Sequence, residues 1–531
     1  MKIAFVNLYP DDTIAQYLLS SYVLKGYIYK NFKGSYLLDI PVLNFKASEK
    51  TDTICEQIFS TNPRIISFSC YIWNIEKVIE CVTHIQESSR EKITVIFGGP
   101  EISEESIRSF SNPGIADYYV FGEGEKKLVQ LLEYIECKTQ NGEKPIPEGI
   151  GVWHREDLKM TKCDDVIRDL DEIPSIYLEE IIESSLIFRK QAFLETQRGC
   201  RFKYRYCVYH KNLNTITYYS LNRIFAELDH LICTKQVYAI RIFDSIFTSD
   251  LKRAKEIIRH LIVLKKDPQI RIPWLYWEFV YTGVDEEFFW LVSCLKTQDV
   301  VKNVKMLKPL DRPQHYSDML KNYTAINCVG IQSFSPAALK SVNRPGMNLE
   351  KFSQFMSMVK KHNIVLKMDI ILGLPFETFT SFFHGLEFLI DYYQDTDHIL
   401  NIHRLQILPG SDLESLVGEY RISYSQTAPH LVYSTNYLTE KEMMRASKLC
   451  AILFRILNSP LRGLFFEDFH RRGASLVAYL ESLLDALATV PDIQKSALMC
   501  ESWVDDVYWN DRIYREIPSR ALIELLKPDT R

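Results

Sequence analysis

Short apolar runs alternate with stretches of helical spacing over the first part of the chain, residues 1–145. Apolar runs of this length are typical of buried strands, and apolar residues that recur every three or four positions are typical of amphipathic helices. The predicted strands lie at residues 2–7, 64–69, 93–97 and 118–121, and the predicted helices at 14–29, 76–88 and 126–137. This alternation predicts an α/β domain with a doubly wound, mostly parallel sheet, as in Rossmann-like folds.

The loops that follow these predicted strands are candidate binding loops. They fall at residues 7–12, 67–74, 98–101 and 122–125. Open parallel sheets bind ligands at the carboxyl ends of their strands, which is where these loops lie. Gly98 and Gly99 are either turn residues or positions where the backbone approaches a ligand closely.

The rest of the chain predicts a second α/β unit and a helical end. Residues 146–190 contain several Pro and Gly residues and two charged stretches, so we expect a linker there. Residues 191–420 alternate again and predict a partial TIM-like (β/α)6 barrel. We expect residues 421–531 to be mainly helical. The six predicted barrel strands are residues 192–196, 239–243, 274–279, 325–331, 365–372 and 401–408.

Composition and charge narrow the class of protein. Hydrophobic residues make up 47% of the chain and charged residues 25%, as in ordinary globular proteins. The formal net charge of -5 offers no basic field for nucleic acid. There is no run of 18 apolar residues to predict a membrane span, and residues 1–9 have the pattern of a strand and not of a signal peptide. We therefore expect a cytoplasmic protein whose 12 cysteines are mostly free thiols.

The sharpest local motif runs from Gly199 to Cys207, directly after the first predicted barrel strand. It resembles the cluster-binding loop of the radical S-adenosylmethionine (SAM) superfamily, which has the form Cys-x3-Cys-x2-Cys with an aromatic residue before the last Cys. Gly199, Cys200, Tyr206 and Cys207 match this form, but Tyr204 stands where the second Cys belongs. The resemblance implies a 4Fe-4S cluster whose candidate ligands are Cys200, Cys207 and Tyr204.

In that superfamily, three thiolates leave one iron of the cluster open, and the methionine part of SAM chelates it. One electron from an external donor then cleaves SAM to give a 5′-deoxyadenosyl radical. Thiolates suit such a cluster because they are soft, anionic ligands. Two thiolates alone should hold it poorly.

Five later segments resemble the family in the expected order: residues 240–247, 277–279, 329–345, 369–375 and 405–411. In the family, a Glu on the third strand contacts the amino group of SAM, and Glu278 occupies that place here. A strand of the form Gly-x-Gln-Ser matches Gln332 and Ser333. The resemblance therefore predicts a SAM site lined by Tyr206, Asp244, Glu278, Gln332 and Ser333.

The amino-terminal part resembles the cobalamin-binding domain that precedes some radical enzymes. The matching pieces are the loops at 67–74, 98–101 and 122–125. The Asp-x-His-x2-Gly motif that gives cobalt a histidine in part of this group is absent, and the first histidine is His84. We therefore expect cobalamin to bind without a histidine lower ligand from this domain. An empty, vestigial domain is the alternative. The candidate cobalamin-binding residues are Ser67, Ser69, Tyr71, Trp73, Asn74, Gly98, Gly99, Pro100, Glu101, Gly122 and Glu123.

Three hypotheses account for Tyr204. In the first, a substitute ligand completes the cluster, and Tyr204, His210, Cys70 and Cys328 are the candidates. In the second, the cluster is lost while cobalamin or SAM serves another role, such as polar methyl transfer. In the third, the chain is a variant of an active enzyme that is changed at this position. A phenol has a pKa near 10, so it is a poor substitute for thiolate.

The resemblance implies a cobalamin-dependent radical SAM-like transferase that modifies, by methylation above all, a small metabolite or a peptide. An alternative is a cluster-less cobalamin- or SAM-binding protein that acts as a non-radical enzyme or a non-catalytic partner. A nucleic-acid-modifying enzyme is a third hypothesis, which the lack of a basic excess disfavours.

Overall fold

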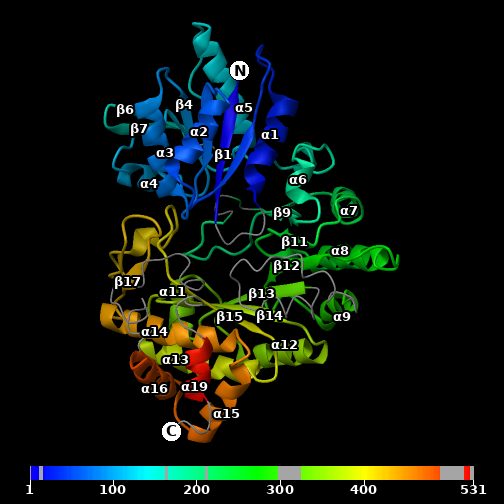
Figure 1. Ribbon diagram of the computed structural model, residues 1–531, viewed down its shortest axis with the longest axis vertical. Coiled ribbons are helices and arrows are strands. Elements are labelled where there is room, and N and C mark those ends of the chain that lie inside the picture. Colours follow the sequence, from blue (N-terminus) through cyan, green and yellow to red (C-terminus); the bar gives the residue numbers. More distant parts are fainter. Residues whose placement is uncertain are drawn as a thin grey trace.

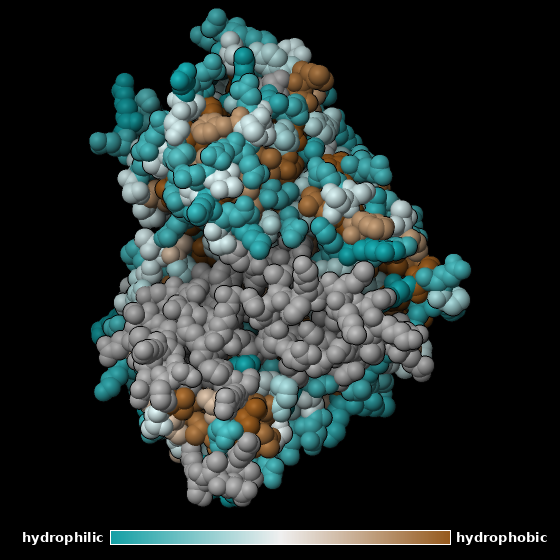
Figure 2. Space-filling view, in the orientation of Figure 1, coloured by the Kyte–Doolittle hydropathy of each residue, from teal (hydrophilic) through white to brown (hydrophobic). Residues whose placement is uncertain are grey.

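The computed structural model contains two sheets of mainly parallel strands, drawn one above the other in Figure 1, and a helical region at the far end. The described residues are 2–10, 16–161, 165–209, 213, 215–296, 325–490 and 519–526. On the face drawn in Figure 2, the amino-terminal unit presents mainly hydrophilic side chains to solvent. Among the described helices, none combines the length and the apolar character that crossing a membrane requires.

The first sheet has seven strands in the order β2-β1-β3-β4-β5-β6-β7. Its first five members are parallel and include all four strands predicted for residues 1–145. An additional strand, β2, lies at one edge. The bounds are β1 (Ile3–Tyr9), β2 (Val42–Lys46), β3 (Ile65–Ser69), β4 (Thr94–Gly98) and β5 (Tyr118–Val120).

Part of the predicted linker belongs to this first sheet. Strands β6 (Ile150–His154) and β7 (Asp157–Met160) extend the sheet beyond β5 in antiparallel pairing. The prediction of a linker over 146–190 is therefore wrong for these two strands. Pro and Gly residues in this stretch lie ahead of the first of these short edge strands, and such signals also occur in connectors.

Alternating residues of β1 explain why helices cover both faces of the sheet. Ile3 and Phe5 enter one apolar core, which also contains residues of α1 and α5, while Ala4 and Val6 enter a second core with residues of α2 and α3. Side chains point to opposite faces at successive strand positions, so a strand covered on both sides is apolar throughout. The helices are α1 (Leu19–Asn31), α2 (Thr51–Ser60), α3 (Ile75–Ser88), α4 (Glu104–Ser109) and α5 (Glu125–Thr139).

The second sheet is an open barrel of six parallel strands in the order β15-β14-β13-β12-β11-β8. All six strands predicted for this region are confirmed. The strands are β8 (Gln191–Leu194), β11 (Ala239–Ile242), β12 (Trp274–Phe279), β13 (Ala325–Gln332), β14 (Leu366–Leu372) and β15 (Ile399–Arg404). Helices on its outer side include α7 (Leu221–Asp229), α8 (Leu251–Leu264), α9 (Glu286–Cys294), α12 (Leu349–Lys361) and α13 (Phe379–Ile390).

The carboxyl-terminal region is mainly helical, as predicted, but it begins with a small hairpin. Strands β16 (Ser423–Tyr424) and β17 (Val432–Ser434) pair antiparallel. Helix α14 packs along β15, where the Asn458 amide bridges the backbone N–H and carbonyl of Leu400. The helices are α14 (Glu440–Leu457), α15 (Arg462–Arg472), α16 (Leu476–Ala488) and α19 (Ser519–Leu526).

The carboxyl ends of the first sheet face the barrel (Figure 1). The Tyr17 hydroxyl accepts a hydrogen bond from the Phe193 N–H at the start of the barrel, at 3.1 Å. Near another edge, the buried Glu101 carboxylate lies 2.9 Å from His430 Nε2. The predicted binding loops of the first sheet thus meet the region where the barrel strands end.

Candidate functional site

The loop from Gly199 to Cys207 follows the short strand β9 (Gln197–Arg198). Gly199 has a φ of +103°, and a Cβ at this position would lie 2.4 Å from the Thr215 carbonyl oxygen. Only glycine fits this turn. The loop is anchored across the barrel mouth, because the Arg205 N–H donates to the Val342 carbonyl and the Arg205 carbonyl accepts from the Leu413 N–H. Cys200, Tyr204 and Cys207 are therefore held at the carboxyl end of the barrel.

Tyr204 lies within a stack of aromatic rings. Its ring centroid is 5.2 Å from that of Phe202 and 5.7 Å from that of Tyr206, with nearly parallel planes. The Arg344 guanidinium lies 4.5 Å from the Tyr204 centroid, a cation–π distance. Burial raises the pKa of Tyr204, although Arg344 opposes the shift, so the phenol stays protonated at neutral pH.

The cysteines of this loop give an incomplete ligand set. Burial also raises the pKa of Cys207. Within the described part of the chain, no three His, Cys, Asp or Glu side chains gather closely enough to hold a metal ion. The described donors are thus two thiols and a buried phenol, which do not fit a cluster that needs three soft, anionic ligands.

The other suggested third ligands have different surroundings. Cys70 is buried, and its thiol donates to the Phe68 carbonyl. The Cys328 thiol donates to an oxygen of Asp369 at 2.9 Å, on neighbouring strands of the barrel. His210 lies outside the described residues. Neither described cysteine joins Cys200 and Cys207 in a metal-binding group.

Glu278 lies on β12 at the barrel mouth, close enough to Cys207 for its charge to contribute to the raised pKa of that thiol. Its side chain is accessible to solvent, while strand neighbours such as Phe279 are buried. The walls of the barrel nevertheless enclose it, and this burial, followed by the charge of Asp369, raises the pKa of Glu278. Glu278 therefore faces an opening inside the barrel, where a ligand can reach it.

Asp244 is engaged by the protein itself. One of its oxygens accepts from the Thr196 N–H at 2.7 Å, and the other accepts from the Thr196 hydroxyl at 2.5 Å. Burial raises the pKa of Asp244 to about 7, against these hydrogen bonds. The observed contacts fix the chain between β8 and β9, directly ahead of the loop that carries Cys200.

Gln332 is the last residue of β13 and Ser333 follows it, and the two side chains have different environments. Gln332 has a φ of +68° at a register shift, and its Oε1 is buried without a hydrogen-bond partner. An unpaired buried acceptor of this kind suits a ligand that donates a hydrogen bond. The Ser333 hydroxyl instead donates to Glu377 at 2.5 Å, so its hydrogen-bonding capacity is used within the protein.

Glu377 makes a testable contribution to stability. Burial raises the pKa of Glu377 to about 8, so the folded chain holds a proton that an unfolded Glu releases near its ordinary pKa. Stability from this group is present below that ordinary pKa and is lost as the pH rises through about 8. We expect Glu377→Gln to be more stable than wild type at pH 9, by on the order of 2–4 kcal/mol. Urea denaturation at pH 5 and pH 9 measures this, and an equal pH dependence in both proteins would refute it.

Two stacked rings stand at the carboxyl end of β3. Tyr71 and Trp73 lie 4.3 Å apart, with an interplanar angle of 12°. Asn74 holds this loop in place, because its amide donates to the Leu8 and Ser69 carbonyls and its oxygen accepts from the Tyr71 N–H. Ser67 and Ser69 are partly exposed on the same strand. The loop therefore offers a flat aromatic surface at the sheet edge that faces the barrel.

The backbone at Gly99 requires glycine, whereas the backbone at Gly98 has room for a Cβ. Gly99 has a φ of +114°, and a Cβ there would lie 2.4 Å from the Cys70 carbonyl oxygen, whereas a Cβ on Gly98 would meet Val120 at an ordinary 3.7 Å. Pro100 and Glu101 follow, and Glu101 pairs with His430.

We expect Gly99→Ala to lower the free energy of unfolding by about 1–3 kcal/mol, because the loops after β3 and β4 must separate. Gly98→Ala is the matched control and should leave it within about 0.5 kcal/mol. Thermal and urea denaturation of both variants measure this. Equal stability of the two would contradict the close contact with Cys70.

The loop at Gly122 and Glu123 is held by a buried ion network. The guanidinium of Arg198 lies 3.4 Å from Glu123, 2.8 Å from Glu125 and 2.9 Å from Glu195. The first two belong to the first sheet's loop and the last to the barrel. This network joins the predicted cobalamin loop to the strand before Cys200.

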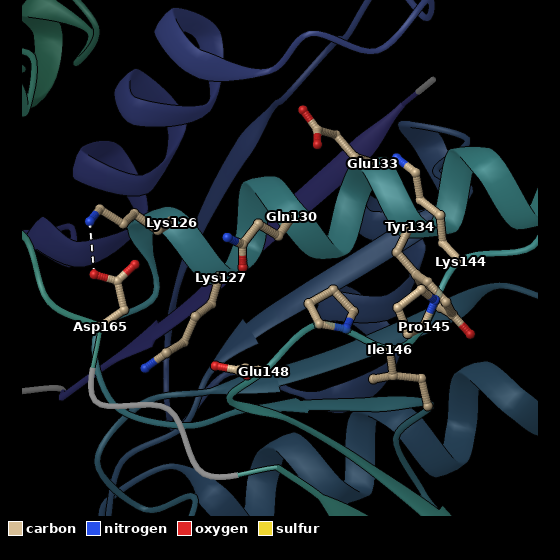
Figure 3. Close-up of a pocket in the computed structure, with 11 residues that line it drawn as sticks. Lys126, Lys127, Gln130, Glu133, Tyr134, Lys144, Pro145, Ile146, Glu148 and Asp165 are labelled. Carbon is tan, nitrogen blue, oxygen red and sulfur yellow. Dashed lines mark hydrogen bonds and ion pairs between the residues drawn. The ribbon is translucent and has the colours of Figure 1, made fainter.

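A separate pocket of about 410 Å³ lies on the outer side of α5 (Figure 3). It is lined by side chains of that helix and of residues 144–148, and Lys126 pairs with Asp165 at its rim. No predicted cofactor-binding residue lines it, so it lies apart from the candidate site.

Comparison with known proteins supports the cobalamin assignment of the first unit. Residues 25–132 match the family model of the B12 binding domain. The 2-(S-pantetheinyl)-carbapenam-3-carboxylate methyltransferase of Streptantibioticus cattleyicolor is 21% identical over 67% of this chain and 48% of its own length. The cobalamin-dependent radical SAM methyltransferase TokK of Streptomyces tokunonensis is 23% identical over 78% of this chain and 56% of its own. The chain thus spans about half the length of these curated relatives.

Solved structures share the fold of both units. The radical SAM methyltransferase TsrM of Kitasatospora setae, with cobalamin and a 4Fe-4S cluster bound, has a TM-score of 0.57 and 14% identity, covering 81% of this chain and 76% of that one. The cobalamin-dependent SAM radical enzyme OxsB, with aqua-cobalamin and SAM bound, has a TM-score of 0.57 and 15% identity, covering 99% and 80%.

The fold and the comparisons define a class of protein, a domain that matches the B12 binding model followed by a parallel α/β barrel whose fold is similar to that of solved radical SAM enzymes. The predicted resemblance to the cobalamin-binding radical SAM enzymes is confirmed, and so are the predicted α/β sheets and helical carboxyl-terminal region. The sequence did not assign Arg198, Arg344 or Glu377 to the site. Arg344 lies in segment 329–345, which resembles the family. Its contact with Tyr204 spans 140 positions of the chain, and no local sequence pattern predicts such a contact.

Proposed function

We propose that this chain is a cobalamin-dependent enzyme on a radical SAM scaffold that transfers a methyl group to a small metabolite or a peptide, and that its cluster-binding loop is altered at Tyr204. The arrangement of the two units carries the proposal. The loops predicted to hold cobalamin end at the barrel mouth, where Glu278 and Gln332 face inward. Bound cobalamin would supply the means to carry a methyl group between a donor and an acceptor.

The chain's own residues would hold the cofactors in separate places. Tyr71 and Trp73 would pack against the corrin from the end of β3. Glu278 and the unpaired Gln332 oxygen would receive the donor groups of SAM within the barrel. Cys200 and Cys207 would hold any iron that the loop binds, but the described ligand set is incomplete for a cluster that cleaves SAM.

A cobalamin titration tests the proposal. We expect hydroxocobalamin to bind about one per chain and Trp73→Ala to weaken the affinity about 10-fold, because aromatic contact area is lost from the binding face. Trp290→Ala, which removes an exposed ring on α9, is the matched control. Absorbance of protein-bound cobalamin after gel filtration measures both. Failure of the wild-type chain to retain cobalamin would refute the proposal.

A second candidate function is a cluster-less cobalamin- or SAM-binding protein that acts as a non-radical enzyme or a non-catalytic partner. The Arg344 guanidinium over the Tyr204 ring favours it, because these protein contacts hold the loop without iron. Retention of cobalamin with no label moving from methyl-labelled SAM to any small molecule or peptide in a cell extract would support this alternative.

A further inference from the structure

The inner face of the barrel is polar where a closed barrel would be apolar. Interiors of such barrels are usually filled with layers of branched apolar side chains. Here one apolar layer, formed by Trp274, Ile326, Val365 and Ile399, closes the amino-terminal end. Charged and polar side chains follow on the inner strand faces, closer to the carboxyl ends of the strands than the apolar layer. They are Arg241, Glu278, Lys367, Asp369 and His403.

These side chains border open space. His403 has 51% of its side chain exposed, although it lies on a barrel strand between buried neighbours. Glu278 is accessible as well. Such exposure on the inner strand faces indicates a cavity that a small polar molecule can enter.

Among the described residues, the Arg241 guanidinium contacts two aromatic rings, but its Nε has no hydrogen-bond acceptor. Its guanidinium lies 4.6 Å from the ring centroid of Tyr276 and 5.4 Å from that of Phe243. The Nε is buried without a hydrogen-bond partner, and among the described residues no carboxylate lies within ion-pair distance of the guanidinium. A buried N–H without an acceptor is costly, and a planar carboxylate satisfies a guanidinium with two parallel hydrogen bonds.

Asp369, one of the two acids of the cavity, already has other partners. Asp369 accepts from Cys328 and from the Asn401 amide and lies 3.5 Å from Lys367. Burial acts to raise the pKa of Asp369, but Lys367 and His403 outweigh it and the pKa is lowered, so this carboxylate stays charged. Lys367 is thereby balanced by Asp369. The charge of Arg241 acts on Glu278 and opposes the raised pKa of that acid, but among the described residues no acceptor takes a hydrogen bond from the Arg241 Nε.

We infer that Arg241 forms a carboxylate-binding subsite inside the barrel, with the rings of Tyr276 and Phe243 as its walls. The carboxylate would come from the methionine part of SAM or from the methyl acceptor. The inference rests on the proposed function in one respect, namely that a small molecule enters the barrel. It does not require that cobalamin binds.

Chemical footprinting tests the subsite in the wild-type chain. Phenylglyoxal modifies accessible arginines, and peptide mass spectrometry reports Arg241 and, as an internal control, the exposed Arg259 on α8. We expect S-adenosylhomocysteine or succinate to protect Arg241 and not Arg259. An Arg241 that neither compound protects would overturn the inference.

Calorimetry separates the two sources of the carboxylate. If the methionine carboxylate binds Arg241, Arg241→Gln weakens S-adenosylhomocysteine about 10- to 100-fold and leaves methylthioadenosine, which lacks that carboxylate, unchanged. If the acceptor binds there, Arg241→Gln leaves S-adenosylhomocysteine unchanged, and succinate still protects Arg241 in wild type saturated with S-adenosylhomocysteine. Arg259→Gln is the control variant. The cobalt content of the same samples tests the proposed cobalamin-dependent function separately from the Arg241 subsite.

Discussion

Tyr204→Cys is expected to convert the loop into a cluster-binding site that holds about four iron per chain after anaerobic reconstitution, well above the wild-type content. The change supplies a third thiolate between Cys200 and Cys207 on a loop that is already anchored to Val342 and Leu413. It also removes the ring on which Arg344 stacks. Iron and acid-labile sulfide per chain measure the effect.

Tyr204→Phe is the matched control for this change. It keeps the aromatic stack but removes the phenol oxygen. If the phenol is no ligand, as its raised pKa indicates, Tyr204→Phe should hold as little iron as wild type. A wild-type chain with about four iron that Tyr204→Phe loses would show that the phenolate is the third ligand.

Arg198→Met is expected to destabilise the chain by about 3–5 kcal/mol, because it leaves three carboxylates in a buried site without their cation. Arg198 is 7% exposed and contacts Glu123, Glu125 and Glu195. Burial raises the pKa of Glu123 and of Glu195, and the Arg198 guanidinium opposes that shift by favouring their charged forms. Urea denaturation at neutral pH measures the loss.

Arg445→Met is the control, since Arg445 pairs with Glu481 on the surface, where such pairs contribute less than about 1 kcal/mol. Because two partners of Arg198 come from the first unit and one from the barrel, we also expect Arg198→Met to lower cobalamin retention. Equal stabilities of Arg198→Met and Arg445→Met would contradict the buried network.

The sequence predicted the regular parts of the fold because each barrel strand is an apolar run between turn signals. Edge strands were harder. Strand β2 is only partly buried, with an Asn at its centre, and β6 and β7 follow Pro and Gly residues that also mark connectors. The sequence also located the candidate loops correctly at the ends of the strands, since parallel sheets place them there.

The partners of the candidate side chains could not be predicted from local patterns. Glu101 meets His430 across 329 positions of the chain, and Glu123 meets Arg198 across 75. Arg241 lies in segment 240–247, which resembles the family, but its lack of an acceptor among the described residues depends on the five other strands of the barrel sheet. Such features follow from the curvature of the barrel sheet and from the contact between the two units, which a single sequence does not encode in any short pattern.

The most direct test of the account is the cobalt and iron content of the wild-type chain after anaerobic purification and reconstitution with iron, sulfide and hydroxocobalamin. The account predicts about one cobalt per chain, with iron well below the four of a complete cluster. Absence of cobalt would contradict the proposed cobalamin-dependent function. A full complement of iron that Cys200→Ala abolishes would contradict the incomplete ligand set and would show that the altered loop still builds a cluster.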